Sequence, residues 1–252
     1  MNDAIERDLL LQIGPPSVSG HWKLRLTALD SWNESEQGQW LALIEGAFIN
    51  LATVGGICGA DGNPELSGSA DTVETEFGDE HIEWHFGQMS IDSGAISLLA
   101  NLCEWGAMRI APATTIEIVP GRYTMNAEPT ERPLPEQLRV ASFAVELHEQ
   151  ENESIQLQAQ FHSALTAKHI SQINHLLKPW HHAVFSGGFA LTQLPIEQSE
   201  VRLGDPPLTI VDNLWCWNFE KYLARPESTN VLVNILERVH RTVCPISLLT
   251  AE

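Results

Sequence analysis

Residues 81–112 have the sequence HIEWHFGQMSIDSGAISLLANLCEWGAMRIAP, and residues 214–245 have the sequence LWCWNFEKYLARPESTNVLVNILERVHRTVCP. The two stretches lie 133 positions apart and align without a gap. Six positions are identical: Trp84 with Trp217, Phe86 with Phe219, Leu99 with Leu232, Asn101 with Asn234, Glu104 with Glu237 and Pro112 with Pro245. Two of these identities form the infrequent pattern Trp-x-Phe. An internal duplication is the simplest explanation of the match.

The residues around the match predict the same order of elements in both copies. Each copy is expected to begin with an alternating strand, over 22–28 in the first copy and over 140–145 in the second. A helix should follow, because apolar residues recur at helical spacing over 40–51 and over 157–165. Two strands, a second helix that ends before a proline, and a short final strand complete each copy.

Strand, helix, strand, strand, helix, strand is the order of a split βαβ, or ferredoxin-like, unit. The predicted fold class is therefore α+β, an internal duplication of two βαββαβ units with mainly antiparallel sheets. The expected organisation is an N-terminal segment over 1–20, a first, acidic repeat over 21–119, a proline-rich linker over 120–137 and a second repeat over 138–252. The two sheets could join edge to edge or pack face to face, and edge-to-edge pairing has a mild preference because it would hide two strand edges.

Charge is unevenly distributed along the chain. The 14 basic and 33 acidic residues give a formal net charge of −19. Between Arg25 and Arg109 there are fourteen Asp and Glu residues and no Lys or Arg, whereas residues 202–241 contain five basic residues. Self-repulsion of this kind destabilises a protein unless salt, a cation or a basic partner offsets it. Adaptation to high salt stays open as an explanation, but the unevenness favours a binding face.

The composition also excludes several classes of partner and location. A strongly negative chain is repelled by nucleic acid and by anionic membranes. No stretch is long enough to span a bilayer, and the apolar run Leu9 to Ile13 is too short for a secretory signal. The four cysteines are far apart in sequence, which is typical of reduced thiols in a cytoplasmic protein.

A strand over 81–86 offers the sharpest local candidate for chemistry. Side chains of a strand alternate, so His81, Glu83 and His85 should face one side of the sheet, opposite the apolar face that carries Trp84. Such a trio is able to bind zinc or to act as an acid-base pair. The corresponding residues of the second copy are Leu214, Cys216 and Asn218, so a solvent-facing polar strand is the favoured interpretation.

Other polar clusters carry weaker signals. Five histidines (His162, His169, His175, His181 and His182) are interpreted as the polar surface of a long helix, because no acidic or cysteine ligand recurs at helical metal-site spacing. The glycine-rich stretch 54–62 lacks the Lys and Ser/Thr of a phosphate-binding loop and is interpreted as a helix end followed by a turn. No catalytic residues, cofactor or metal site are predicted.

The acidic hairpin is the predicted partner-binding site. Six carboxylates lie within thirteen residues around a turn near Gly78, and a solvated hairpin is the plain alternative. The candidate partner-binding residues are Asp71, Glu74, Glu76, Asp79, Glu80, His81, Glu83 and His85.

In size, charge and its paired Trp-x-Phe strands, Trp84-x-Phe86 and Trp217-x-Phe219, the chain resembles the bacterial immunity proteins that neutralise contact-delivered polymorphic toxins. The resemblance implies a cytoplasmic inhibitor of a cognate basic toxin, with nucleases as one class of target. An acidic inhibitor associates rapidly with a basic cleft through electrostatic steering.

Two other functions stay open. The first is an enzyme or small-molecule sensor that holds its ligand between the two repeats. The second is a scaffold subunit that uses exposed aromatic residues such as Trp32 or Trp180 as interface anchors. A homodimer also stays open.

Overall fold

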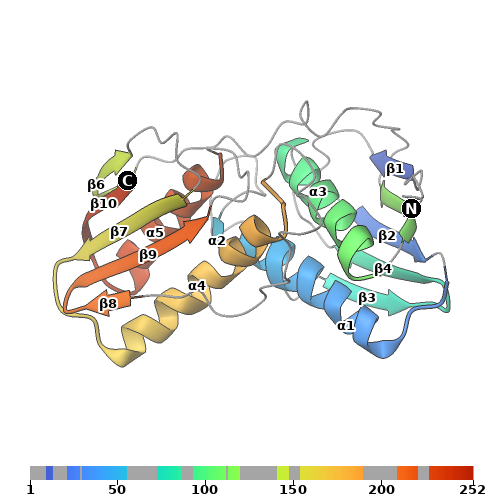
Figure 1. Cartoon of the computed structure of the whole chain (residues 1–252), viewed down its shortest axis with the longest axis horizontal. Helices are drawn as coiled ribbons and strands as arrows, with labels where there is room; N and C mark the ends of the chain where they lie inside the picture. The colour runs from blue at the N-terminus through green and yellow to red at the C-terminus, as the bar shows by residue number, and fades with distance from the viewer. Residues whose placement is uncertain are drawn as a thin grey trace, which may run out of the picture.

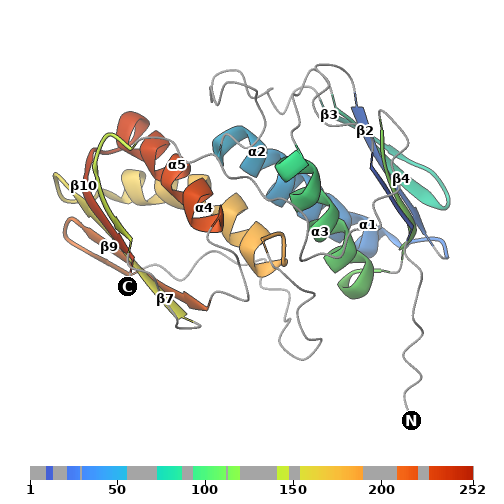
Figure 2. The same ribbon diagram turned by 90° about the horizontal axis from the view of Figure 1, so that it is seen from above.

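The computed structural model describes residues 10–13, 22–28, 30–55, 73–86, 93–111, 113–119, 141–147, 154–189, 209–220 and 227–251. The fold is α+β, with two mostly antiparallel five-stranded sheets and four helical segments. The two sheets lie on opposite outer sides of the molecule, and the helices lie between them (Figures 1 and 2). The protein is thus layered as sheet, helices, helices, sheet.

The first unit runs from β1 to β5. Its strands are β1 (Leu10–Ile13), β2 (Trp22–Ala28), β3 (Val73–Phe77), β4 (His81–Phe86) and β5 (Ala113–Val119). One long helical segment consists of α1 (Glu34–Leu41), the π-helical η1 (Ala42–Ile49) and α2 (Asn50–Gly55), and the other helix is α3 (Ser93–Arg109). Asn33 begins α1 with a capping box, in which its side chain accepts from the backbone of Glu36.

The second unit has the same sequence of elements. Its strands are β6 (Ala144–Leu147), β7 (Ser154–Phe161), β8 (Thr209–Val211), β9 (Leu214–Glu220) and β10 (Ile246–Ala251). Its helices are α4 (Ala167–Phe185) and α5 (Glu227–Thr242). Thr166 caps α4 in the same way that Asn33 caps α1.

Strand order is the same in the two sheets. The first sheet has the order β1-β5-β2-β4-β3 and the second β6-β10-β7-β9-β8. In each sheet the first strand pairs in parallel with the last one, and the other pairs are antiparallel. Strand β1 therefore adds an edge to the first sheet, although Leu9 to Ile13 was expected to lie outside the repeat.

The sequence match falls on corresponding elements. Strands β4 and β9 begin at His81 and Leu214, and strands β5 and β10 begin at Ala113 and Ile246, so both pairs are 133 residues apart. The expected strand over 22–28, the helix after it and the turn near Gly78 are also confirmed.

The inner faces of both sheets are apolar, as the alternation predicted. Ile82, Trp84 and Phe86 on β4 are at most 1% exposed. Trp215 and Trp217 on β9 are fully buried, and they stack edge to face with ring centroids 5.8 Å apart. Aromatic pairs in this geometry contribute about 0.5 to 1.5 kcal/mol beyond the area they bury. The side chain of Phe219 lies outside the described residues.

The beginning of the second unit differs from the prediction. The helix expected over 157–165 is strand β7, and the true helix, α4, begins at Ala167. The strand expected over 140–145 is β6, a short edge strand. Apolar residues at 157 and 161 fit both periods, but the intervening residues decide between them, since glutamines at 156, 158 and 160 alternate with buried side chains.

Helices of the two units pack against each other, so the preference for edge-to-edge sheet pairing is wrong. Helix α4 contacts η1 and α2, and α5 contacts α2. The Asn101 side chain on α3 donates to the Gly188 carbonyl at 3.0 Å, a buried bond across the two units. Both units share one continuous cluster of buried apolar residues, and burial of apolar surface stabilises their association.

A buried carboxylate ties the second unit together. Glu237 on α5 is 6% exposed and accepts from the Ser142 backbone at 2.8 Å, the Ser142 hydroxyl at 2.7 Å and the Arg241 guanidinium at 2.5 Å. Burial acts to raise the pKa of Glu237, but these hydrogen bonds and the charge of Arg241 outweigh it, so the pKa is lowered.

Candidate functional site

The outer face of the first sheet is lined by charged side chains from four neighbouring strands. In the strand register Glu117 on β5 pairs with Arg25 on β2, Arg25 pairs with Glu83 on β4, and Glu83 pairs with Glu76 on β3. The next row places Lys23 opposite His85 and His85 opposite Glu74. Strand alternation thus brings both basic residues of β2 onto the acidic face of the hairpin.

Glu83 lies at the centre of this face and is only 8% exposed. The Lys23 ammonium donates to its two carboxylate oxygens at 3.1 and 3.2 Å. The Arg25 Nε lies 4.0 Å from the same carboxylate, and the Lys23 and Arg25 side chains are 36% and 40% exposed. Because its charge is neutralised within the sheet, Glu83 stabilises the sheet rather than offering a free charge to a partner.

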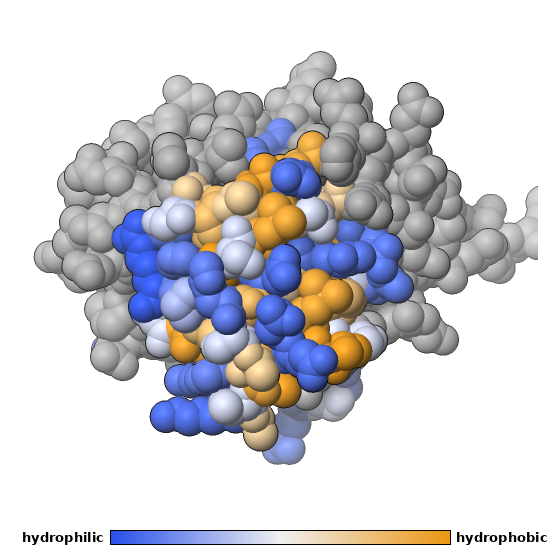
Figure 3. Space-filling view, turned by 90° about the vertical axis from the view of Figure 1, so that its left-hand side faces the viewer, coloured by the Kyte–Doolittle hydropathy of each residue, from blue (hydrophilic) through white to orange (hydrophobic). Residues whose placement is uncertain are grey.

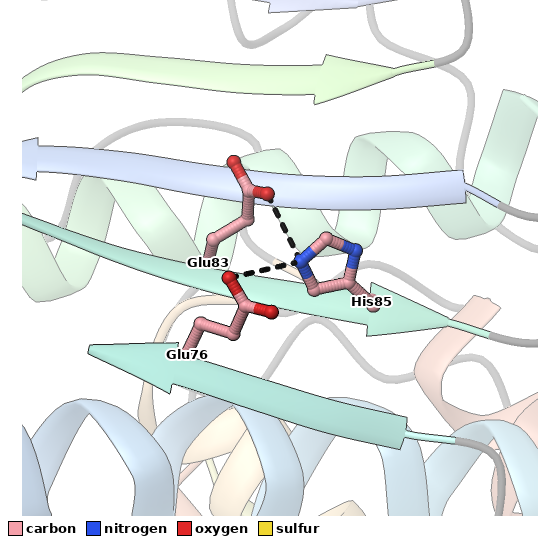
Figure 4. A group of neighbouring side chains, drawn as sticks. All are labelled: Glu76, Glu83 and His85. Carbon is pink, nitrogen blue, oxygen red and sulfur yellow. Dashed lines mark ion pairs between the residues drawn. The ribbon is translucent and has the colours of Figure 1, made fainter. Parts of the chain in front are cut away.

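His85 joins Glu83 to the edge strand, as Figure 4 shows. Its Nε2 lies 3.0 Å from Glu83 Oε1 and 3.8 Å from Glu76 Oε2. The three side chains come from adjacent strands and converge on one point (Figure 4). The His85 imidazole therefore lies between the two carboxylates.

The same three residues form the one group with metal-ligand geometry found in the described part of the chain. Their ligand atoms all lie within 4.8 Å of one another. The trio differs from the His81, Glu83, His85 set of the sequence, because the His81 ring lies against Gly78 at the turn. Lys23 is already bound to Glu83, so a cation entering here would have to displace an ammonium group.

The exposed carboxylates of the hairpin lie around this paired centre. Glu74, Glu76, Asp79 and Glu80 are all exposed. Across the described residues, the side chains of Glu74, Asp79 and Glu80 make no hydrogen bond or ion pair, and Glu76 has only His85 at 3.8 Å. These four residues therefore carry unneutralised negative charge at the edge of the sheet. Asp71, the remaining predicted carboxylate, lies outside the described residues.

The imbalance of charge follows the division into units. Residues 1–119 contain 18 acidic and 4 basic residues, a net charge of −14, whereas residues 120–252 contain 15 acidic and 10 basic residues, a net charge of −5. Two of the four basic residues, Lys23 and Arg25, contact Glu83. The alternation of residues along β2 could have predicted that Lys23 and Arg25 lie on the outer face. Their pairing with Glu83 could not be predicted in this way, because it depends on the register between β2 and β4.

The histidines of the second unit do not form a site of this kind. His162 follows β7 and precedes α4, and His175 is exposed on the helix. His181 and His182 are 3% and 6% exposed, so their assignment to a polar helix surface is wrong. They turn inward because the last turns of α4 pack among helices of both units, and the His181 ring lies 5.4 Å from that of Trp217.

The structure also shows where Trp32 and Trp180 lie, the two residues considered above as interface anchors of a scaffold subunit. Trp180 is fully buried, where its indole donates to the Ser228 carbonyl at 2.6 Å, so it is not an exposed anchor. Trp32 is half-buried and stacks on Trp40 with ring centroids 5.8 Å apart.

The buried thiol of Cys103 is not an activated nucleophile. Burial raises the pKa of the Cys103 thiol well above its ordinary value, and the charge of Glu104 raises it further. Cys103, Cys216 and Cys244 are free.

None of the described helices combines the length and apolarity needed to cross a membrane. No protein-family model, curated protein or solved structure matches the chain.

Proposed function

We propose that this protein binds a basic protein through the exposed carboxylates of the β3–β4 hairpin and thereby blocks the partner's functional surface. The observation that carries the proposal is the set of four exposed carboxylates, Glu74, Glu76, Asp79 and Glu80, around a centre whose charge is already neutralised. Lys and Arg side chains of a partner would neutralise them on binding. The first unit's charge of −14 would steer that partner toward this end of the molecule.

Within this proposal, the partner is a cognate toxin and the protein is a bacterial immunity protein in the cytoplasm. A toxin that acts on nucleic acid carries a basic cleft for phosphates, and an acidic hairpin occupies such a cleft in place of the phosphates. The free cysteines support a reducing compartment.

We further propose that the two units are duplicated split βαβ, or ferredoxin-like, units, each extended by one parallel edge strand. Their common strand order and the constant offset of 133 residues support this proposal. The hairpin of the first copy then differs from that of the second both in its charge and in the length of its edge strand, which has five residues in β3 and three in β8. A specialised binding role for one copy would account for the difference in charge.

The test is the association rate of charge variants with the basic partner captured from the native host. Replacing Glu74 and Glu76 by Gln removes two exposed carboxylates and leaves the Glu83 ion pairs in place. Because rim charges act mainly on the rate of association, we expect association to slow by about tenfold at low salt. The difference should shrink as added salt shortens the Debye length.

The matched control changes the same number of charges in the second unit. Glu146 and Asp212 are both exposed, and Glu146→Gln with Asp212→Asn raises the net charge by the same two units. The residue at position 212 has φ 54°, which Asn tolerates well. This control should slow association far less. Equal slowing by both double variants would reject the hairpin as the binding site and leave only the effect of net charge.

The alternative of a ligand between the two repeats has no specific observation in its favour. Where the units meet, the described side chains are in contact: a Cβ at Gly188 would lie 2.7 Å from Leu98 Cδ1.

A further inference from the structure

The outer face of the second sheet differs in chemistry from that of the first. The central strand β7 presents Gln156, Gln158 and Gln160 on this face, alternating with buried Leu157, Ala159 and Phe161. Gln158 pairs across the strands with Cys216 on β9 and with Thr250 on β10.

Apolar side chains accompany the glutamines. Leu248 and Leu214 flank Gln160 in one cross-strand row, and Val211, 59% exposed, continues that row on the edge strand β8. Figure 3 views the molecule from the side of the second sheet, and apolar side chains are interspersed there with polar ones.

The centre of this face, around Gln158, carries no charged side chain among the described residues. Among the described side chains of β10, β7 and β9, none that points outward belongs to Asp, Glu, Lys or Arg. Two carboxylate residues lie at the margins of this face. Glu146 is on the edge strand β6, in the cross-strand row of Thr250 and Gln158, and Glu220 is the last residue of β9, opposite Ser154 in the register.

We infer that the outer face of the second sheet binds a second copy of this chain, sheet against sheet, around a twofold axis near Gln158. A twofold interface brings a surface against itself, so each group must be compatible with its own copy. Glutamine amides meet this requirement because each one both donates and accepts hydrogen bonds. Carboxylates or ammonium groups would not, since each would face its own charge.

The position of this face also minimises repulsion between two acidic chains. The two sheets lie on opposite sides of the molecule (Figures 1 and 2). Joining two copies through their second sheets therefore places the two first units, each with a charge of −14 over residues 1–119, at the far ends of the dimer. Both acidic hairpins stay accessible in this arrangement.

The area of the face sets the expected affinity of the dimer. The five strands contain 28 residues, which at a rise of about 3.3 Å and a strand spacing of about 4.8 Å cover on the order of 450 Å². Standard stable interfaces bury about 800 Å² per partner. We therefore expect a weak dimer, with a dissociation constant on the order of 10 to 100 µM.

Sedimentation equilibrium of the full chain between 5 and 500 µM, roughly the range that brackets such a constant, tests the inference. Gln158→Glu places a carboxylate opposite its own copy and should weaken dimerisation by at least about tenfold. The matched control, Gln172→Glu on the exposed surface of α4, adds the same charge away from the face and should leave the dissociation constant within about twofold.

Salt distinguishes this association from binding to a basic partner. Added salt should strengthen the dimer, because it screens the repulsion between two negative chains, whereas it should weaken the complex with a basic protein. The dimer is therefore testable whether or not a basic partner exists.

Alkylation of Cys216 locates the interface independently of any charge variant. Cys216 is half-buried beside Gln158, whereas Cys103 and Cys244 are buried. With Cys58 replaced by Ser, the rate of Cys216 alkylation by iodoacetamide should fall as the protein concentration rises through the dimer dissociation constant. A protein that stays monomeric at 500 µM and high salt would overturn the inference. The inference would be overturned equally by a dimer that Gln158→Glu does not weaken and in which the alkylation rate of Cys216 does not fall as protein concentration rises.

Discussion

Replacing Glu83 by Gln removes the charge at the centre of the first sheet's outer face and keeps the shape of the side chain. In the folded protein Glu83 has Lys23 Nζ at 3.1 Å and Arg25 Nε at 4.0 Å. At an effective dielectric constant of about 40, between that of a protein surface and that of water, these contacts contribute about 2 to 3 kcal/mol each before desolvation is counted. The exposure of both cations and the burial of Glu83 offset most of this attraction.

We expect Glu83→Gln to lower the free energy of unfolding by about 1 to 2 kcal/mol, which corresponds to a fall in Tm of roughly 3 to 6 °C for a chain of this size. Urea unfolding followed by tryptophan fluorescence measures it. A double-mutant cycle with Lys23→Met isolates the pair, and its coupling energy should be about 1 kcal/mol. Glu74→Gln, an exposed residue two strand positions from Glu76, is the control and should stay within about 0.5 kcal/mol of wild type. Equal losses from Glu83→Gln and Glu74→Gln would refute the distinction between a paired centre and free surrounding carboxylates.

Three further predictions concern the fold. Trp84→Ala and Trp217→Ala each remove a fully buried indole and should each lower the free energy of unfolding by about 3 to 5 kcal/mol, as measured by denaturant titration. Gly188→Ala should cost about 1 to 3 kcal/mol in the same assay, because its new methyl group would lie 2.7 Å from Leu98 Cδ1 across the two units; no loss would show that the helices separate easily. The lowered pKa of Glu237 means that its contribution is complete above the unfolded-state pKa of about 4.3 and is lost as the pH falls through the folded-state value. Stability curves of wild type and Glu237→Gln should therefore converge below about pH 4, and a constant difference down to pH 2 would contradict this linkage.

Local sequence patterns predicted most elements of the first unit and the second half of the second unit. Strict alternation identified the inner face of β4, and the repeat identified β9 as its counterpart. The apolar residues before α4 led to the wrong prediction of a helix over 157–165, since residues 157 and 161 are compatible with both a helix and a strand. Strand β1 was missed because it is four residues long and pairs with the last strand of its unit, more than 95 residues away in sequence. Strand β6 overlaps the strand expected over 140–145.

The candidate site was predictable in part for a similar reason. The acidic hairpin and the outward direction of Glu83 and His85 follow from the order of residues alone. The neutralisation of Glu83 does not, because it depends on register with β2, whose Lys23 is 60 residues away. Burial of His181 and His182 likewise depends on packing between the two units, which the periodicity of helix α4 alone does not predict.

The most direct test of the proposed function is zero-length carbodiimide cross-linking of the protein to the partner captured from its native host, followed by mass spectrometry. The reagent joins carboxylates to lysines in contact, so it reports which acidic residues meet a basic partner. We predict cross-links from Glu74, Glu76, Asp79 or Glu80 to lysines of a protein with a net positive charge. Recovery of no basic partner, or cross-links confined to carboxylates of the second unit, would contradict the proposal that the hairpin of the first unit is the binding site.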